Sequence, residues 1–141
     1  MSLALDTKVL VLLSGLILLW GMALGTWKYR QMSVSDSGLA HPYVDIAHRA
    51  ALMYSFATLV LAALAQFSGW PVAVDLTAGL IVVAFFVGAI ASYVVHGFLA
   101  DTDNQFVKPV RGTTAFMFAL IIGELGGTAV LVAGFVQKQF L

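Results

Sequence analysis

The chain has 141 residues, of which 61% are apolar and only 10% are charged, and its formal net charge is zero. A soluble domain of this length is about half apolar and about a quarter charged, so lipid is the expected solvent for most of the surface. The absence of cysteine excludes disulfides, thiolate metal sites and cysteine nucleophiles, and the neutral charge balance argues against nucleic acid as a partner.

Four apolar stretches are long enough to cross a membrane. A span needs roughly 20 mostly apolar residues, and these stretches are too long and too unalternating to be barrel strands. They cover residues 9–27, 47–67, 72–99 and 113–136. We therefore predict an all-α integral membrane protein, in which residues 1–141 form one domain built as a bundle of four transmembrane helices.

Small residues recur at four-residue spacing in the first and last stretches. Gly21 and Gly25 form one such motif, and Ala119, Gly123 and Gly127 form a longer one. This spacing lets helix backbones approach closely. Packing within the bundle is the simpler interpretation, and a subunit interface is the alternative.

The second stretch begins with polar residues. Pro42 suits the first turn of a helix, which puts His41 at the helix start. His41, Asp45 and His48 then share one helical face. This spacing resembles a set of metal ligands, although one helix supplies two or three ligands at most. Asp45 also suits the positive first turns of a helix for local reasons. Arg49 can reach lipid phosphates, Asp45 or the acidic edge of a cofactor.

The short connection "SGWP" predicts an antiparallel hairpin between the second and third stretches. The third stretch carries Tyr93 and His96 in its last two turns, so His96 reaches the same membrane face as His48. Two imidazoles on neighbouring helices are typical of membrane b-type cytochromes. Alternatively, one histidine binds a metal while the other donates a hydrogen bond or reaches the membrane interface.

The two longer connections, residues 28–45 and 100–111, are polar and lie on one face of the membrane if there are four spans. Their side of the membrane carries more cationic residues than the side of the termini. The cations near the loops are Lys28, Arg30, Arg49, Lys108 and Arg111, and those near the termini are Lys8 and Lys138. The positive-inside rule therefore predicts cytoplasmic loops and termini outside.

Glu124 lies at the centre of the last stretch, where a charge is most costly. We expect its carboxyl to be protonated, hydrogen-bonded to a neighbouring helix, or both. A proton path needs ionisable partners at the same depth, and the first two stretches offer only Ser14, Ser55 and Thr58. Structural packing is therefore the simpler interpretation.

The segments "AHRAALMYSFATLVLAALA" and "ASYVVHGFLADTDNQF", followed by a glycine-rich last span, resemble the styrene oxide isomerase family. The resemblance runs from His48 to the end of the fourth helix. It includes an Ala-His pair opening the second helix, a tyrosine late in the third, and Asn-Gln-Phe in the next loop. It implies a small protein of the bacterial inner membrane, a homotrimer that holds haem b between its subunits.

The resemblance also implies roles for individual residues. His48 matches the axial ligand of the haem iron, and Tyr93 matches the active-site tyrosine. Ferric iron acts in the family as a Lewis acid on an epoxide oxygen, and hydride migration then gives an aldehyde without net redox. The implied substrate is a small hydrophobic epoxide that enters from the bilayer. Arg49, His96 and Asn104 are the other residues expected around the cofactor.

Tyr54 is a departure from the family, which has an asparagine six residues after the ligand. We expect Tyr54 to take that active-site position, and the change bears on isomerase activity more than on haem binding. Tyr54 lies roughly 120° around the helix from His48. It therefore reaches the same cofactor only at its periphery or across a subunit boundary.

Two other classes of protein remain open. A bis-histidine cytochrome would use His48 and His96 to close a six-coordinate iron and would carry electrons. A small non-catalytic subunit of a larger membrane complex would bind no haem, and its polar residues would only support helix packing.

Overall fold

A computed structural model describes residues 2–141. These residues form four α-helices and no β-strand, and each helix is long and apolar enough to cross a membrane. The helices are α1 (Leu5–Val34), α2 (Pro42–Gln66), α3 (Val72–Leu99) and α4 (Thr113–Phe140). The prediction of an all-α protein with four membrane-spanning helices is confirmed.

The helices are longer than the apolar stretches that predict them, except for α3, whose bounds match. The largest difference is at the end of α1, which continues through polar residues to Val34. Hydropathy identifies only the part of a helix that suits lipid, whereas the backbone hydrogen bonds continue until a breaker such as the "SDSG" segment. The first turns of α2 likewise precede its apolar stretch, with Pro42 at the first helical position.

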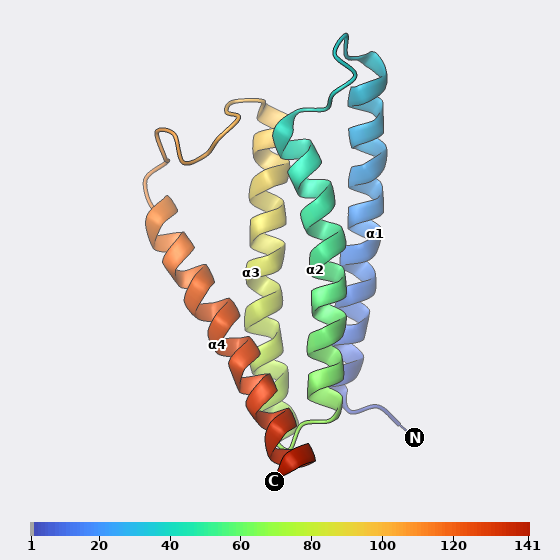
Figure 1. Ribbon diagram of the computed structural model, residues 1–141, viewed down its shortest axis with the longest axis vertical. Coiled ribbons are helices and arrows are strands. Elements are labelled where there is room, and N and C mark those ends of the chain that lie inside the picture. Colours follow the sequence, from blue (N-terminus) through green and yellow to red (C-terminus); the bar gives the residue numbers. More distant parts are fainter. Residues whose placement is uncertain (1) are drawn as a thin grey trace.

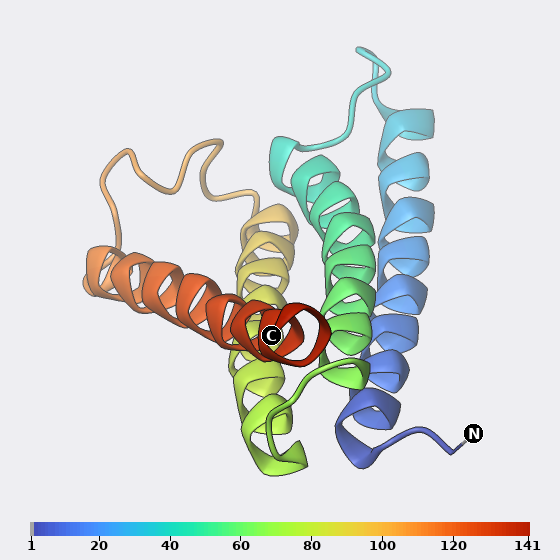
Figure 2. The same cartoon turned by 60° about the horizontal axis from the view of Figure 1, so that its bottom comes forward.

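The first three helices pack side by side, and α4 crosses α3 at an angle (Figure 1). It contacts α2 and α3 towards its C-terminal end and diverges from α3 towards its N-terminal end, as Figure 2 also shows. Both termini lie at one end of the molecule, which we call the terminal end. Residues 35–41 and 100–112 lie at the opposite end, the loop end.

The glycine motif of α1 packs against α2. A side-chain carbon on Gly21 would lie 3.0 Å from Leu52, and one on Gly25 would lie 2.8 Å from the His48 ring. Farther along the same interface, the Ser14 hydroxyl donates a hydrogen bond of 2.8 Å to the Ser55 carbonyl. The Gly21 and Gly25 motif therefore serves packing within the bundle, which was the simpler interpretation.

The glycines of α4 serve the same purpose against α3. A side-chain carbon on Gly123 would overlap the Phe85 ring, and one on Gly127 would lie 2.6 Å from Val82. Elsewhere α4 presents large apolar side chains outward: Phe118, Ile122 and Leu125 are all more than 60% exposed. Such a surface suits lipid or another protein chain.

Candidate functional site

His48 is held by the backbone of α1. Its Nδ1 lies 2.8 Å from the Gly21 carbonyl oxygen, and the contact is partly buried. A carbonyl only accepts hydrogen bonds, so Nδ1 is the donor, and in the neutral form of the ring Nε2 carries the lone pair. Within residues 2–141, no hydrogen bond engages Nε2. This is the state in which an imidazole binds a metal, with its other nitrogen fixed by a carbonyl.

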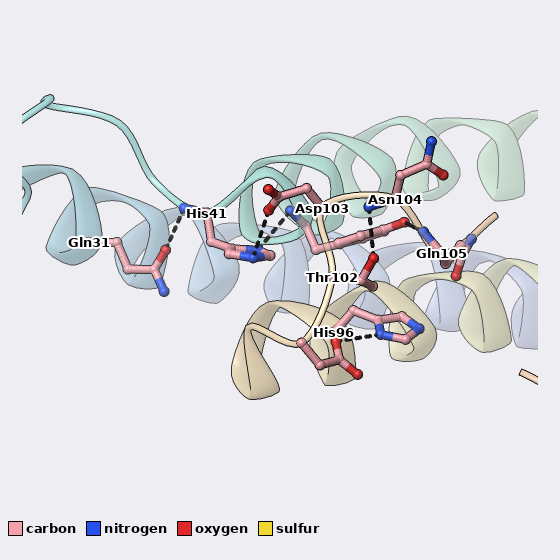
Figure 3. Close-up of polar contacts among 9 residues, drawn as sticks. Gln31, His41, His96, Thr102, Asp103, Asn104 and Gln105 are labelled. Atoms are coloured by element: carbon pink, nitrogen blue, oxygen red, sulfur yellow. Dashed lines mark hydrogen bonds and ion pairs between the residues drawn. The ribbon is translucent and has the colours of Figure 1, made fainter. Parts of the chain in front are cut away.

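His41 has a structural role at the start of α2. It is the N-cap residue, and its Nδ1 accepts a hydrogen bond of 3.2 Å from the Tyr43 backbone N–H. Its Nε2 lies 3.3 Å from an Asp103 carboxylate oxygen, and its own backbone N–H donates to Gln31 (Figure 3). His41 thus joins the two polar loops at the loop end.

Asp45 and Arg49 form an ion-paired group with α1. The Asp45 carboxylate lies 2.6 Å from Lys28 and 2.8 Å from Arg49. The polar residues at the start of α2 therefore contact different partners, although His41, Asp45 and His48 share one helical face. No group of three His, Cys, Asp or Glu side chains anywhere in residues 2–141 is arranged to hold a metal ion.

His96 has a carboxylate partner in the loop that follows α3. Its Nδ1 lies 2.9 Å from Asp101 Oδ1, and its ring packs 5.2 Å from that of Tyr43. The hydrogen bond from His96 holds the pKa of the exposed Asp101 carboxyl below its ordinary value. The His96 side chain is only 17% exposed. The contact therefore pairs a partly buried imidazole with an exposed carboxylate at the loop end.

A cavity of about 900 Å³ lies between α3, α4 and residues 100–112. Tyr54 of α2 reaches into it beside Tyr93 and His96 of α3, so the structure brings these three predicted residues together. The polar end of the cavity also includes Gln105, Lys108 and Arg111, and its apolar side includes Ala89, Phe116, Met117 and Leu120. A small molecule with an apolar body and one polar group matches this lining.

The other predicted residues lie outside this cavity. His48 faces α1, and Arg49 is paired with Asp45. Asn104 is exposed, and its side-chain oxygen accepts a hydrogen bond from the Phe106 backbone within its own loop (Figure 3 shows its position). Within one chain, then, His48 and His96 do not line a common cavity.

Tyr43 is a site residue that the sequence analysis did not identify. Its hydroxyl accepts a hydrogen bond of 2.6 Å from the Gln105 backbone N–H, and its ring packs beside both Tyr93 and His96. Tyr43 therefore positions residues 100–112, the loop that borders the cavity. An aromatic residue in the first turn of α2 was the available signal, but only the return of the loop over the bundle gives it this role.

Glu124 does not make the hydrogen bond to a neighbouring helix that was one of the two expectations for it. Its Oε1 is buried and has no hydrogen-bond partner within residues 2–141. No protein-family model, curated protein or solved structure matches the chain. The fold and the cavity define a class, namely a four-helix membrane protein with a tyrosine- and histidine-lined cavity at its loop end.

Proposed function

We propose that this chain is a haem b protein of the bacterial inner membrane that converts small hydrophobic epoxides to carbonyl compounds, as its resemblance to styrene oxide isomerases implies. The observation that carries the proposal is the hydrogen bond between His48 Nδ1 and the Gly21 carbonyl, 2.8 Å long. It orients the ring and leaves Nε2 available for iron.

The residues around His48 fit a haem ligand. Gly25 has no side chain where the imidazole lies, and a carbon there would be 2.8 Å from the ring. Arg49 follows His48 in α2, and its side chain is 64% exposed. It can therefore leave its ion pair with Asp45 and pair with a haem propionate instead. When bound, ferric haem would supply a Lewis acid for the epoxide oxygen.

The chain's own contribution to catalysis is made by the cavity. The Tyr54 ring stacks 4.2 Å from Phe86, which fixes its direction, and Tyr93 lies in the same cavity. Their hydroxyls donate hydrogen bonds to a substrate oxygen and hold the molecule in one orientation. The apolar α3 and α4 side chains exclude water, which would otherwise add to the opened ring.

His48 and the tyrosine cavity lie on different sides of one chain, so the proposal requires that a second copy complete the site. We propose the homotrimer of the resembling family, with the cofactor between subunits. The outward apolar face of α4, which includes Ile122 at 71% exposure, supplies surface for such contacts. Native mass spectrometry in detergent tests this: a monomer that retains bound haem would contradict it.

The deciding experiment is an absorption spectrum of the purified protein after haem reconstitution. We expect a five-coordinate, high-spin ferric spectrum, and we expect His48→Ala to lose the Soret band while His41→Ala keeps it. His41 is the matched control because it caps α2 and lies outside the proposed haem site. If His48→Ala keeps its full Soret absorbance, His48 is not the ligand.

Turnover tests the tyrosines separately from haem binding. Tyr93→Phe should keep its haem content and lose about two- to tenfold in kcat, because one hydrogen bond contributes about 0.5–1.5 kcal/mol. The matched control is Tyr29→Phe, which changes an exposed tyrosine of α1. Equal rates in the two variants would remove Tyr93 from the mechanism.

One observation favours a second candidate, the bis-histidine cytochrome. The contact between His96 and Asp101 also fixes Nδ1, and no hydrogen bond within residues 2–141 engages its Nε2. If His96 of one copy and His48 of another bind the same iron, the ferric spectrum is low-spin and six-coordinate. An absent Soret band would instead favour the non-catalytic subunit.

A further inference from the structure

Two carboxyl groups are buried at the terminal end of the bundle, far from the cavity. Asp6 of α1 is 2% exposed and Asp75 of α3 is 1% exposed. Neither forms an ion pair within residues 2–141, and the cations at this end, Lys8 and Lys138, are exposed. Asp75 Oδ1 is fully buried and has no hydrogen-bond partner among these residues.

Helix packing places the two carboxyls at the same level. Leu10 of α1 lies against Gly79 of α3, since a side-chain carbon on Gly79 would be 2.9 Å from the Leu10 methyl groups. The two helices run in the same direction (Figure 1). Asp6 and Asp75 each lie about one helical turn before these contacting residues. The two aspartates are therefore at the same level in the bundle.

The third helix of this packed group adds another oxygen. The antiparallel register of α2 and α3 is given by Tyr54, which stacks on Phe86. Continued to the terminal end, this register brings Gln66 level with Asp75. The Gln66 Oε1 is also buried and has no hydrogen-bond partner within residues 2–141. Three helices thus contribute oxygen acceptors at one level.

Two buried carboxylates without an ion-pair partner need a positive counter-charge, because an unpaired buried charge is costly. The N-termini of α1 and α3 lie at this end, but each supplies only about half a positive charge. A single shared proton would still leave the Gln66 oxygen without a donor. Asp6 Oδ1 accepts a hydrogen bond of 2.7 Å from the Thr7 backbone N–H, but Asp75 Oδ1 and Gln66 Oε1 have no donor within residues 2–141. Buried acceptors without donors indicate a missing water or ion.

We propose that Asp6, Asp75 and Gln66 bind one hard divalent cation at the terminal end, for which Ca²⁺ is the appropriate probe. Such ions prefer carboxylate and amide oxygens and take about six to eight of them. The two carboxylates and the amide supply up to five oxygens, and water completes the set. The bound ion joins α1 to α3 and is independent of haem and of the cavity.

The test uses the full-length protein in detergent, treated with EDTA and then desalted. Calorimetric titration with CaCl2 at neutral pH should show one saturable site per chain, and bound Ca²⁺ should raise the Tm. Asp75→Asn should abolish binding, whereas Asp36→Asn, which changes an exposed aspartate at the loop end, should bind as the wild type does.

A second variant covers the case in which Asp75→Asn does not fold. Gln66→Met keeps both carboxyls and should weaken Ca²⁺ binding by about tenfold or more, as expected for loss of a ligating group. No Ca²⁺ binding by the wild type overturns the proposal. If the wild type binds no Ca²⁺ and its Tm rises on acidification, whereas the Tm of Asp75→Asn does not, the two carboxyls share a proton.

Discussion

The position of His48 depends on the absence of a side chain at residue 25. A carbon there would lie 2.8 Å from the His48 ring, whereas one at Gly15 would meet nothing within 4 Å. We expect Gly25→Ala to displace the ring from the Gly21 carbonyl and to lower the free energy of unfolding by about 1–3 kcal/mol. The same substitution at Gly15 should raise it by about 0.5–1 kcal/mol.

Equilibrium unfolding in mixed micelles measures both variants. Haem reconstitution provides a second readout, because only Gly25→Ala should weaken the Soret band. If the two alanine variants have equal stability and equal haem content, the ring of His48 is not confined by α1.

The contact between His96 and Asp101 predicts a dependence on pH. The hydrogen bond from His96 lowers the pKa of Asp101 below the ordinary 3.8. A carboxyl with a lowered folded pKa contributes stability above its unfolded pKa, and the contribution is lost as the pH falls through the lower, folded value. The contact should therefore order the loop at neutral pH and release it only in strong acid.

Carbon-13 NMR of labelled aspartate carboxyls measures this pKa directly. We expect the titration midpoint of Asp101 to lie below 3.8 in the wild type and to return to about that ordinary value in His96→Gln. A midpoint that is the same in both proteins would show that the contact does not form in solution.

Two hydrogen bonds attach α4 to the bundle at the terminal end. The indole Nε1 of Trp70 donates a hydrogen bond of 2.9 Å to the Val130 carbonyl. The Gly69 backbone N–H donates one of 2.9 Å to the Gly134 carbonyl. Towards its N-terminal end α4 diverges from α3, and the cavity opens between them there (Figure 2). The hairpin between α2 and α3 therefore acts as the anchor of α4.

We expect Trp70→Phe to weaken this anchor by about 1 kcal/mol, the usual contribution of one hydrogen bond. Hydrogen exchange should then become faster in the C-terminal half of α4 and stay unchanged in α1. Trp27→Phe is the matched control, because its indole makes no hydrogen bond within residues 2–141. Equal exchange in both variants would mean that Trp70 does not hold α4.

Apolar length predicted the helices because lipid imposes a simple condition: a spanning segment must satisfy its own backbone groups and present apolar side chains. The bounds of α3 followed from this condition alone. The last turns of α1 did not, because Lys28 and its neighbours are polar. They remain helical beyond the apolar stretch, and Lys28 pairs there with Asp45 on the adjacent helix.

The site was predictable only where chain order determined depth. Tyr93 and His96 share a cavity because both lie in the last turns of α3. The direction of His48 depends on Gly21 of another helix, and the Asp101 contact depends on how an irregular loop returns over the bundle. Neither contact produces a periodic pattern in the sequence. The sequence therefore predicted that His48 and His96 lie at the same depth, but it did not predict which way the side chain of His48 points.

The whole molecule has a polarity that its topology fixes, since both termini lie at one end and both polar loops at the other (Figure 1). Four cationic residues lie in or beside the loops, Lys28, Arg30, Lys108 and Arg111, and Arg49 is close to them. Only Lys8 and Lys138 lie near the termini. The positive-inside rule then predicts that the loop end faces the cytoplasm.

Single cysteines test this orientation, because the chain has no cysteine of its own. A membrane-impermeant maleimide should label Leu141→Cys in intact cells and should label Ser37→Cys only after the membrane is permeabilised. The opposite result would reverse the orientation and put the cavity outside. Since the proposed calcium site lies at the terminal end, the same result also decides whether that site faces the outer medium, where free Ca²⁺ is abundant, or the cytoplasm, where tighter binding would be needed.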